Sequence, residues 1–427
     1  MSDNNSIVNP NKSLEIPKWI NQEYFEAVLK KDEPNYVKIV NFTPVAAIPP
    51  GENFTSVMLR IHLDLVINDG TTKHKTYVVK TMLAEDRGGK QVKEVGIFDK
   101  ELHMYQTYLP QFEAIYKEAG EEIQLAPKCL QTEERDDGIH FIFEDLGELQ
   151  FQNVDRIKGL DMEHMKTVLY KLAEFHAVAA VYVERNGPFP KEFDEGFMTR
   201  KYQDFQDSAF KLKRESFVKA MAAWGMDNPE VYTENFPTAD QFSKMCLRNL
   251  DIDSQSFNTL THGDLWSSNL LFKYQPDGSI DQMIMLDYQL CKYGSPALDL
   301  LFIITISAAN DIRIKEFDNF VRIYWERLIE CLQLLKYQKP LTTLRELQKS
   351  IYHENNTFYP FFAIFNHLPV IQFPSDEQSN LHSLKDESEE GNKFRWRLFT
   401  NPAYAAIMKD LYPFLANRGI FQFKDFE

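Results

Sequence analysis

The stretch THGDLWSSNLLF at residues 261–272, followed by MIMLDYQL at residues 283–290, decides how this chain is interpreted. Asp264 lies on a segment expected to form a tight loop after a strand, Asn269 follows on the same loop, and Asp287 ends a later strand. Carboxylate and amide oxygens are the ligands that Mg²⁺ prefers in proteins. Two carboxylates held close together repel each other without a cation, so the pattern itself implies a bound metal ion.

The spacing of these residues matches the catalytic loop of kinases, H-x-D-x-x-x-x-N. In phosphoryl transfer from ATP, one aspartate accepts the proton of the attacking hydroxyl, and a second aspartate and an asparagine hold Mg²⁺. Asp264 is therefore predicted to be the base, and Asn269 and Asp287 are predicted to be the Mg²⁺ ligands.

Two features favour a small-molecule acceptor over a protein acceptor. Gly263 stands where protein kinases carry an arginine that usually binds a phosphorylated activation loop. Asp299 follows Asp287 within a dozen residues, inside the apolar run SPALDLLFII, which leaves little room for an activation segment. Asp299 is expected to accept hydrogen bonds from the catalytic loop, which His262 is expected to position. His176, on an apolar helix, is expected to be a hydrogen-bonded core residue.

The nucleotide-binding half is predicted from Lys80, which lies in YVVKTML on the second strand of a hairpin. A lysine among apolar strand residues is poorly placed unless it has an anionic partner. Lys80 is therefore expected to act in catalysis by pairing with the α- and β-phosphates of ATP and with a glutamate on a helix. Glu101 is the predicted glutamate because it shares a helix face with Phe98 and Tyr105, and Glu94 is its competitor.

Two short segments complete the predicted cofactor site. The sequence GENFTS at residues 51–56 lies where a loop covering the phosphates is expected, and its backbone N–H groups are predicted to contact them. The link EDLG at residues 144–147 is the predicted hinge, whose backbone groups would meet the edge of an adenine. The cofactor-binding residues predicted in these segments are Asn53, Phe54, Ser56, Glu144, Asp145 and Leu146.

The rest of the pattern predicts an α+β fold with a small antiparallel sheet followed by a larger, mostly helical part. Residues 57–67 alternate apolar and polar side chains, which is typical of a half-buried strand, and Asn68-Asp69-Gly70 supplies turn chemistry before a second strand at residues 76–83. Other predicted elements are helices over 91–108 and 162–183 and strands over 139–143, 259–261, 270–274 and 283–286.

The predicted organisation is therefore an N-lobe over residues 1–143, a hinge over 144–147 and a helical C-lobe over 148–427. Residues 188–255 within the C-lobe are expected to line the acceptor site. The polar run at 374–392 is expected to be a solvated loop or a mobile segment.

Composition excludes several classes of partner. The 427 residues carry a formal net charge of −16, which argues against nucleic acid and against anionic membrane surfaces. The start of the chain has no signal-peptide pattern, and the most apolar stretch, residues 300–309, is too short to span a membrane. The four cysteines form no CxxC pair. We expect a cytoplasmic protein that is a monomer or a weak homodimer.

Taken together, these motifs resemble the insect ecdysteroid-kinase-like family, a branch of the kinase-like fold that includes choline kinases and aminoglycoside phosphotransferases. The resemblance runs from about Gly51 to the C-terminal helices and is most specific at HGDLWSSN (262–269) and LDYQ (286–289). It implies a bilobal fold with ATP between the lobes, and the same roles for the catalytic, metal-binding and phosphate-positioning residues named above. It further implies an acceptor such as an ecdysteroid alcohol.

The acceptor itself stays open at this point. Aromatic residues gather at 188–255 and at 358–365, and an apolar pocket would suit a steroid-like alcohol, although aromatic stripes at helical spacing are more often core. The acidic balance favours neutral or cationic acceptors. The alternatives are a choline- or aminoglycoside-type kinase, a nucleotide-binding pseudoenzyme that regulates a partner, and a carrier for apolar ligands.

Overall fold

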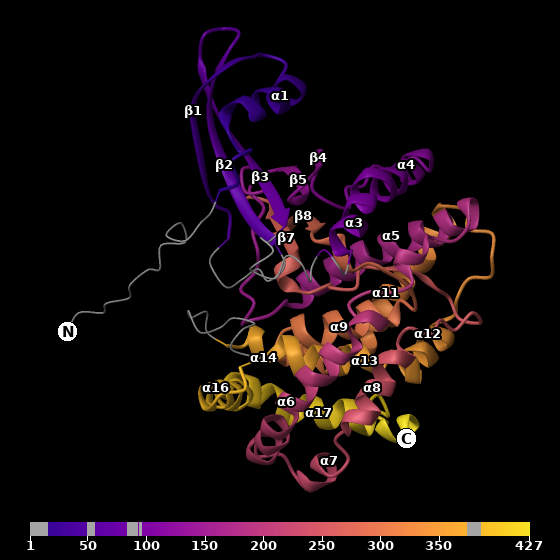
Figure 1. Cartoon of the computed structure of the whole chain (residues 1–427). Helices are drawn as coiled ribbons and strands as arrows, with labels where there is room; N and C mark the ends of the chain where they lie inside the picture. The colour runs from indigo at the N-terminus through magenta and orange to yellow at the C-terminus, as the bar shows by residue number, and fades with distance from the viewer. Residues whose placement is uncertain (1–15, 49–55, 83–92, 94–95, 374–385) are drawn as a thin grey trace. The chain divides into compact units, whose positions relative to one another are not determined.

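The computed structural model describes residues 16–48, 56–82, 93, 96–373 and 386–427 (Figure 1). The chain forms two compact units. The first unit holds the chain up to residue 106 together with residues 127–151, and the second holds residues 107–126 and most of the chain from residue 152 onward. The predicted α+β class, with an N-terminal antiparallel sheet and a mostly helical remainder, is confirmed.

Residues 107–126 group with the second unit, whereas the sequence-based division placed them in the first part. They contain α4 (Leu109–Glu118), which packs on α5 (Met162–Asn186). The Tyr116 hydroxyl donates a hydrogen bond to the carbonyl of Glu174 at 3.0 Å, and Phe112 lies edge-to-face against Phe175. These contacts join residues far apart in the sequence, so local pattern cannot reveal them.

The first unit is built on a five-stranded antiparallel sheet in the order β1-β2-β3-β5-β4. The predicted hairpin is formed by β2 and β3, with Leu59 opposite Val79 and Met58 opposite Lys80. Alternation in β2 buries Leu59, Ile61, Leu63 and Leu65 completely. The strands are β1 (Tyr36–Ala46), β2 (Ser56–Ile67), β3 (Thr72–Met82), β4 (Cys129–Arg135) and β5 (Gly138–Glu144).

Two N-terminal elements were not predicted from the sequence, α1 (Gln22–Asp32) and β1. The side chain of Asn21 caps α1 by accepting a hydrogen bond from the Tyr24 N–H, and Phe25, Val28 and Leu29 bury one face in the core of the sheet. Irregularities in the pairing of β1 with β2 interrupt its alternation. This interruption explains why a period of two is hard to recognise in β1.

The predicted helix over 91–108 begins in residues that lie partly outside the described part of the chain, and its described part changes its pitch. In the described residues, α3 (Ile97–His103) is followed directly by a π-helical segment, η2 (Met104–Tyr108). Phe98, Glu101 and Leu102 are buried on α3. The buried face therefore carries the glutamate that the sequence selected.

The second unit is mostly helical, with α5 and α9 at its centre. Asp161 caps α5 by accepting hydrogen bonds from the N–H groups of Glu163 and His164, and the helix ends at Asn186, three residues beyond the predicted end. Every residue of α9 is buried, so the most apolar run of the chain is a core helix. The other helices are α6 (Gln203–Ala223), α7 (Glu230–Thr233), α8 (Ala239–Arg248), α9 (Ala297–Ser307), α10 (Asn310–Arg313), α11 (Phe317–Leu334), α12 (Leu344–Ile351), α13 (Phe358–Phe362), α14 (Leu368–Ile371), α16 (Glu389–Phe399) and α17 (Pro402–Asn417).

Four short strands in this unit carry the loops of the motif. β6 (Thr259–Thr261) pairs with β9 (Lys292–Gly294), and β7 (Leu270–Tyr274) pairs with β8 (Ile280–Met285), both antiparallel. The three short strands predicted here are confirmed, with β8 beginning three residues earlier than expected. Asp264 follows β6 and Asp287 follows β8.

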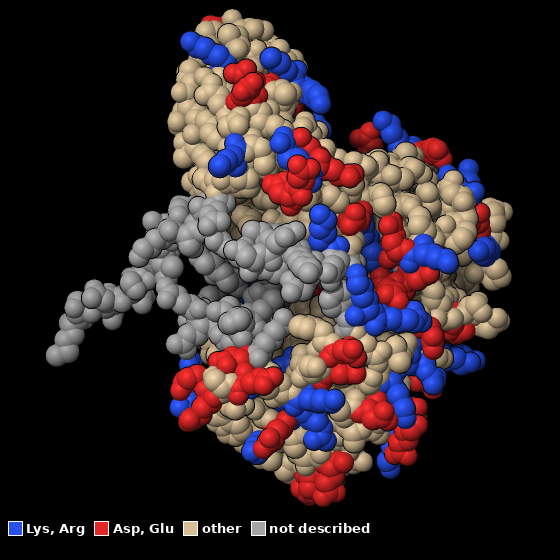
Figure 2. Space-filling model, viewed as in Figure 1, with Lys and Arg blue, Asp and Glu red and all other residues tan. Residues whose placement is uncertain are grey.

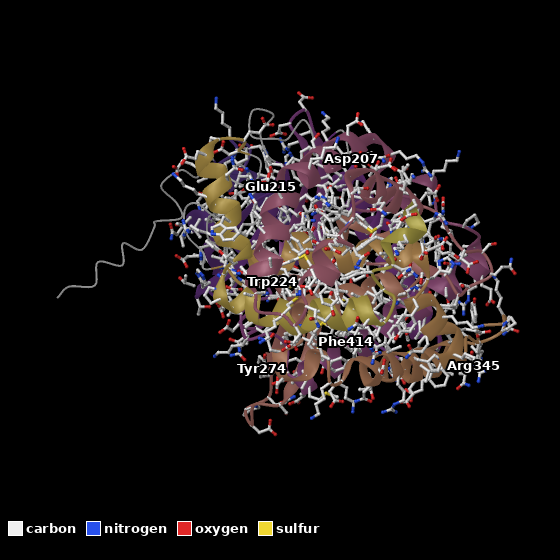
Figure 3. All side chains as sticks on the ribbon, turned by 90° about the horizontal axis from the view of Figure 1, so that it is seen from below. Asp207, Glu215, Trp224, Tyr274, Arg345 and Phe414 are labelled. Carbon is white, nitrogen blue, oxygen red and sulfur yellow. The ribbon has the colours of Figure 1, made fainter. Side chains whose placement is uncertain are left out.

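Many aromatic residues of the predicted acceptor region pack as core. Phe210 on α6 stacks on Phe242 of α8 with ring centroids 4.2 Å apart, and Phe217 lies against Phe365 at 4.9 Å. Trp224, which follows the last residue of α6 and is labelled in Figure 3, donates its indole N–H to the carbonyl of Phe399. For these side chains, the core interpretation is the correct one.

The polar run expected to be a loop is partly helical. Residues 374–385 lie outside the described part of the chain, but residues 389–392 form the first turn of α16. The Ser388 hydroxyl accepts a hydrogen bond from the Gly391 N–H, and the acidic side chains of Glu389 and Glu390 favour the N-terminal end of a helix. The acidic side chains predict a solvated loop, but the same charges also stabilise the N-terminal end of a helix.

Charges of both signs are interspersed on the surface. On the face shown in Figure 2, Lys and Arg side chains alternate with Asp and Glu over the described residues. In the part of the chain that the structure describes, no helix is both long and apolar enough to cross a membrane.

Candidate active site

The loop after β6 carries the first aspartate of the motif, and α9 holds that loop in place. The carboxylate of Asp299 accepts hydrogen bonds from the backbone N–H groups of His262, at 2.6 Å, and Gly263, at 2.9 Å. Burial alone would raise the pKa of Asp299, but hydrogen bonds from His176 and from the loop outweigh it and lower that pKa. The predicted contact between Asp299 and the loop is confirmed.

His176 on α5 extends this network into the core. Its Nε2 lies 3.1 Å from Asp299 Oδ2, and its Nδ1 lies 2.7 Å from the hydroxyl of Tyr324 on α11. It is a buried, hydrogen-bonded histidine, as the sequence indicated. Only the tertiary structure shows that it supports the carboxylate that holds the catalytic loop.

Gly263 allows the loop to turn next to a neighbouring backbone segment. Its φ is +80°, in the left-handed region that favours glycine, and a Cβ atom there would lie 2.1 Å from the carbonyl oxygen of Leu290. The residue that distinguishes this loop from that of protein kinases is therefore required by the local packing.

Replacing Gly263 with alanine is expected to lower both stability and phosphoryl transfer. The left-handed backbone and the clash with Leu290 together should lower the free energy of unfolding by more than about 1 kcal/mol. A backbone shift that relieves the clash would also move the loop that carries Asp264. Thermal unfolding and the transfer rate of the purified variant would measure both effects.

Gly187→Ala is a matched control for this substitution. Gly187 also has a positive φ, +90°, but nothing lies within 4 Å of the position of its Cβ atom. It should lose some stability through backbone strain and keep its turnover. Equal loss of turnover in both variants, or full activity of Gly263→Ala, would contradict the role of this close approach.

His262 connects the two loops of the motif. Its Nδ1 accepts the backbone N–H of Asp264 at 3.3 Å, and its Nε2 lies 2.9 Å from the carbonyl oxygen of Leu286, directly before Asp287. Burial lowers the pKa of His262, so the ring is neutral and donates from Nε2. With both ring nitrogens bonded to backbone, the ring has the predicted positioning role.

The side chains of Asp264 and Asn269 lie against each other. Asn269 ends the 3₁₀ turn η5 (Ser267–Asn269), and its amide Nδ2 donates to the backbone carbonyl of Asp264 at 2.9 Å and to its Oδ2 at 3.1 Å. With the amide nitrogen used in this way, the amide oxygen is the end of Asn269 suited to a cation. The five-residue spacing seen in the sequence thus brings the two functional groups together.

Asp287 has an unusual backbone conformation. It follows β8 with φ of 66°, and its Oδ2 accepts a hydrogen bond from Gln289 Nε2 at 3.1 Å. The Leu286 N–H donates to the carbonyl of Asn269 at 2.9 Å, so the chain just before Asp287 is bonded to the catalytic loop. A non-glycine residue in the left-handed region is uncommon and often marks a functional position.

The electrostatics of this group suit a divalent cation. Burial raises the pKa of Asp264 well above its usual range, and the negative charge of Asp287 raises it further. Among the described residues, no cluster of three or more His, Cys, Asp or Glu side chains is arranged to bind a metal ion. One amide oxygen and one carboxylate, beside a second carboxylate, fit Mg²⁺, which keeps several ligands from water and substrate.

In the first unit, Lys80 is paired as the sequence indicated. Its Nζ lies 2.6 Å from Glu101 Oε2, both side chains are almost completely buried, and the ammonium group also faces the ring of Phe98. Residue 94, where the competing glutamate stands, lies outside the described residues. The contact of Lys80 with phosphates stays a prediction.

The predicted hinge ends β5 and is anchored through Asp145. Its carboxylate accepts hydrogen bonds from Arg60 Nε and from the Thr76 hydroxyl, both at 2.6 Å. Burial opposes ionisation of Asp145, but these bonds outweigh it and lower its pKa. Glu144 accepts the backbone N–H of Lys128. The side chains of Glu144 and Asp145 are thus used within the protein, as are the backbone N–H of Glu144 and the carbonyl of Asp145.

The segment predicted to cover the phosphates is described only in part. Asn53 and Phe54 lie outside the described residues, and Ser56 is the buried first residue of β2. Leu146 is buried, and its carbonyl accepts the N–H groups of Leu149 and Phe151. Phosphate binding by the first segment and adenine binding by the hinge stay predictions.

One residue beside Asp264 was missed by the sequence analysis. His367 ends a π-helical segment, η8 (Ala363–His367), and its Nε2 lies 3.7 Å from Asp264 Oδ1. About a hundred residues separate the two in the chain, and no motif spacing relates them. The local signal was only a histidine after an aromatic run, which is not specific.

Comparison with known proteins gives weak similarity to solved structures and one match to a family. No curated protein matches the chain. Two solved structures with weak similarity are a GDP complex of a point mutant of aminoglycoside 2'-phosphotransferase-IIIa and the GDP complex of the wild-type enzyme. The first has 13 % identity and a TM-score of 0.41 over 93 % of this chain and all of that one. The second has 11 % identity and a TM-score of 0.41 over 90 % and 98 %.

The comparison with family models is more specific. The model of the ecdysteroid kinase-like family matches residues 50–337, which include Lys80, Glu101 and the whole catalytic loop through Asp299. Because this match spans well over half of the chain, the protein belongs to the ecdysteroid kinase-like family and is a small-molecule phosphotransferase.

Proposed function

We propose that the protein transfers the γ-phosphoryl group of ATP, in the presence of Mg²⁺, to a hydroxyl group of an ecdysteroid or a similar apolar alcohol. The observation that carries the proposal is the loop geometry of Asp264 and Asn269, with its backbone held by Asp299 and bonded to the segment before Asp287. Phosphoryl transfer depends mostly on positioning and charge stabilisation, and this loop supplies both.

The residues take distinct roles in this proposal. Asp264 accepts the proton of the attacking hydroxyl, and its bond to Asn269 keeps the carboxylate oriented. Asn269 and Asp287 would hold Mg²⁺, which neutralises charge on the phosphate oxygens when bound. Lys80 would bind the α- and β-phosphates, and its ion pair with Glu101 orients the ammonium group.

Two observations favour an apolar alcohol. Membership of the ecdysteroid kinase-like family points to this class. The side of the Asp264 loop nearest His367 is lined by aromatic rings, because Trp266, Phe302 and Phe362 all lie against the histidine. Apolar and aromatic walls with few polar groups are typical of pockets for small, largely apolar ligands.

A panel assay tests the proposal. Purified protein with Mg²⁺ and γ-labelled ATP is incubated with ecdysone, other polar steroids, choline, ethanolamine and aminoglycosides, and Asp264→Asn serves as the blank. We expect label on the ecdysteroid and none in the blank.

The other outcomes separate the alternatives. Label on choline or an aminoglycoside would confirm the kinase and replace the acceptor class. No transfer to any acceptor, despite tight binding of Mg²⁺-ATP, would contradict the proposed activity and favour a regulatory pseudoenzyme.

A further inference from the structure

His367 lies at the edge of the catalytic loop, in a cage of aromatic rings. Its ring centroid is 5.0 Å from that of Phe302, 5.1 Å from that of Phe362 and 5.9 Å from that of Trp266. All three contacts are edge-on. The imidazole is therefore held in one orientation by packing, with one nitrogen towards Asp264.

The distance from His367 to Asp264 suggests a bridging atom. The separation of 3.7 Å between Nε2 and Oδ1 is too long for a direct hydrogen bond. Two polar atoms at this separation can both bond one oxygen atom placed beside them. Oδ1 is the carboxylate oxygen nearest His367, whereas Oδ2 accepts a hydrogen bond from Asn269, and the carboxylate is also hydrogen-bonded to the Trp266 side chain.

The charge state of His367 fits a donor rather than an ion-pair partner. Burial, together with the positive charge of Lys213 on α6, lowers the pKa of His367 to about 3, so the ring is neutral. The Lys213 ammonium donates to the amide oxygen of Asn366, the residue before the histidine. A neutral imidazole carries one N–H, and a neighbouring carboxylate favours placing it on the nitrogen that faces it.

The second ring nitrogen supports this tautomer. Nδ1 of His367 is buried and has no hydrogen-bond partner among the described residues. With the proton on Nε2, the N–H of the ring points towards Asp264, and no buried N–H donor is left without an acceptor at Nδ1. The single proton of the ring therefore belongs on Nε2.

We propose that His367 is a second group acting on the acceptor, donating a hydrogen bond from Nε2 to the oxygen of the hydroxyl that Asp264 deprotonates. The inference rests on the proposed function and deepens it. The hydroxyl oxygen uses one lone pair to accept this bond, directs its O–H towards Asp264 Oδ1, and keeps its other lone pair for attack on the γ-phosphorus. The bond from oxygen to phosphorus forms, the bond from phosphorus to the β,γ-bridging oxygen breaks, ADP leaves with that electron pair, and the proton passes to Asp264.

Two substitutions of similar size separate this role from a structural one. His367→Gln keeps an N–H donor near the position of Nε2, whereas His367→Leu fills the same space without a donor. If the donor orients the acceptor, the leucine variant should lose about 10–100-fold in kcat for ecdysone, the scale of a misplaced reactant, and the glutamine variant should stay within about fivefold of wild type. The dissociation constant for Mg²⁺-ATP should be unchanged in both.

Two controls make the result decisive. Thermal unfolding shows whether either variant is misfolded, and His74→Ala, at a half-exposed position in the first unit, shows the effect of losing an unrelated imidazole. Equal turnover of the leucine and glutamine variants, at wild-type or at reduced level, would overturn the inference while leaving the kinase activity of the wild type intact. Absence of transfer by the wild-type protein to every acceptor in the panel would overturn the proposed function and this inference with it.

Discussion

Asp264→Asn is expected to reduce kcat by about 10²–10⁴-fold, the usual scale for removal of a general base, while the affinity for Mg²⁺-ATP changes little. Asparagine keeps the shape of the side chain, and its amide oxygen can still accept the hydrogen bond from Asn269. What it loses is the capacity to take the proton of the acceptor hydroxyl. Transfer of label from γ-labelled ATP and titration with a fluorescent nucleotide measure the two quantities separately.

The same variant should not lose stability. The carboxylate of Asp264 is disfavoured by burial and by the charge of Asp287, so a neutral side chain of the same size removes an unfavourable interaction in the protein without metal. We expect a thermal midpoint equal to or above that of wild type in the presence of a chelator. Asp277→Asn, at an exposed turn position after β7, is the matched control and should leave turnover unchanged. Full activity of Asp264→Asn would show that another group is the base.

Asp287→Asn is expected to raise the Mg²⁺ concentration needed for half-maximal activity by at least about tenfold. Residues that only hydrogen-bond to a metal ligand typically contribute 10–100-fold to metal affinity. A carboxylate that binds the metal directly contributes its charge as well. Asparagine tolerates the left-handed backbone of this position, so the loop should keep its conformation. Activity is measured against Mg²⁺ concentration at fixed ATP.

Binding of ATP without metal provides the internal control for this variant. In the presence of a chelator, Asp287→Asn and wild type should bind the nucleotide alike, because the lost group acts through the cation. If the Mg²⁺ dependence of the variant equals that of wild type, Asp287 is not a ligand. If nucleotide binding is weakened equally with and without Mg²⁺, the side chain acts on the nucleotide directly.

The features that the sequence predicted well are those encoded over short distances. Asp264 and Asn269 are brought together by one tight loop and one 3₁₀ turn, so their spacing alone reports their proximity. The pairing of Lys80 with Glu101 was found from a strand and a helix, because each has one buried face and the two charges need each other there.

The features that it missed have physical reasons. Pairing irregularities disturb the alternation of β1, so its period of two is weak. The acidic residues Glu389 and Glu390 were interpreted as part of a solvated loop or mobile segment, although their charges favour the N-terminal end of α16. The aromatic residues Phe210 and Phe217 are spaced as a helix face, and that pattern is the same whether the face meets a ligand or the core.

By itself, the sequence determined the fold class, the catalytic loop, the metal-binding candidates and the buried ion pair, because each depends on the periodicity of a single element or on a spacing of a few residues. Only the tertiary structure decided which groups surround Asp264. The support of Asp299 by His176 and the approach of His367 to Asp264 join residues more than a hundred positions apart. Such contacts arise from how helices pack, and packing depends on the shapes of all the side chains between them rather than on any local pattern.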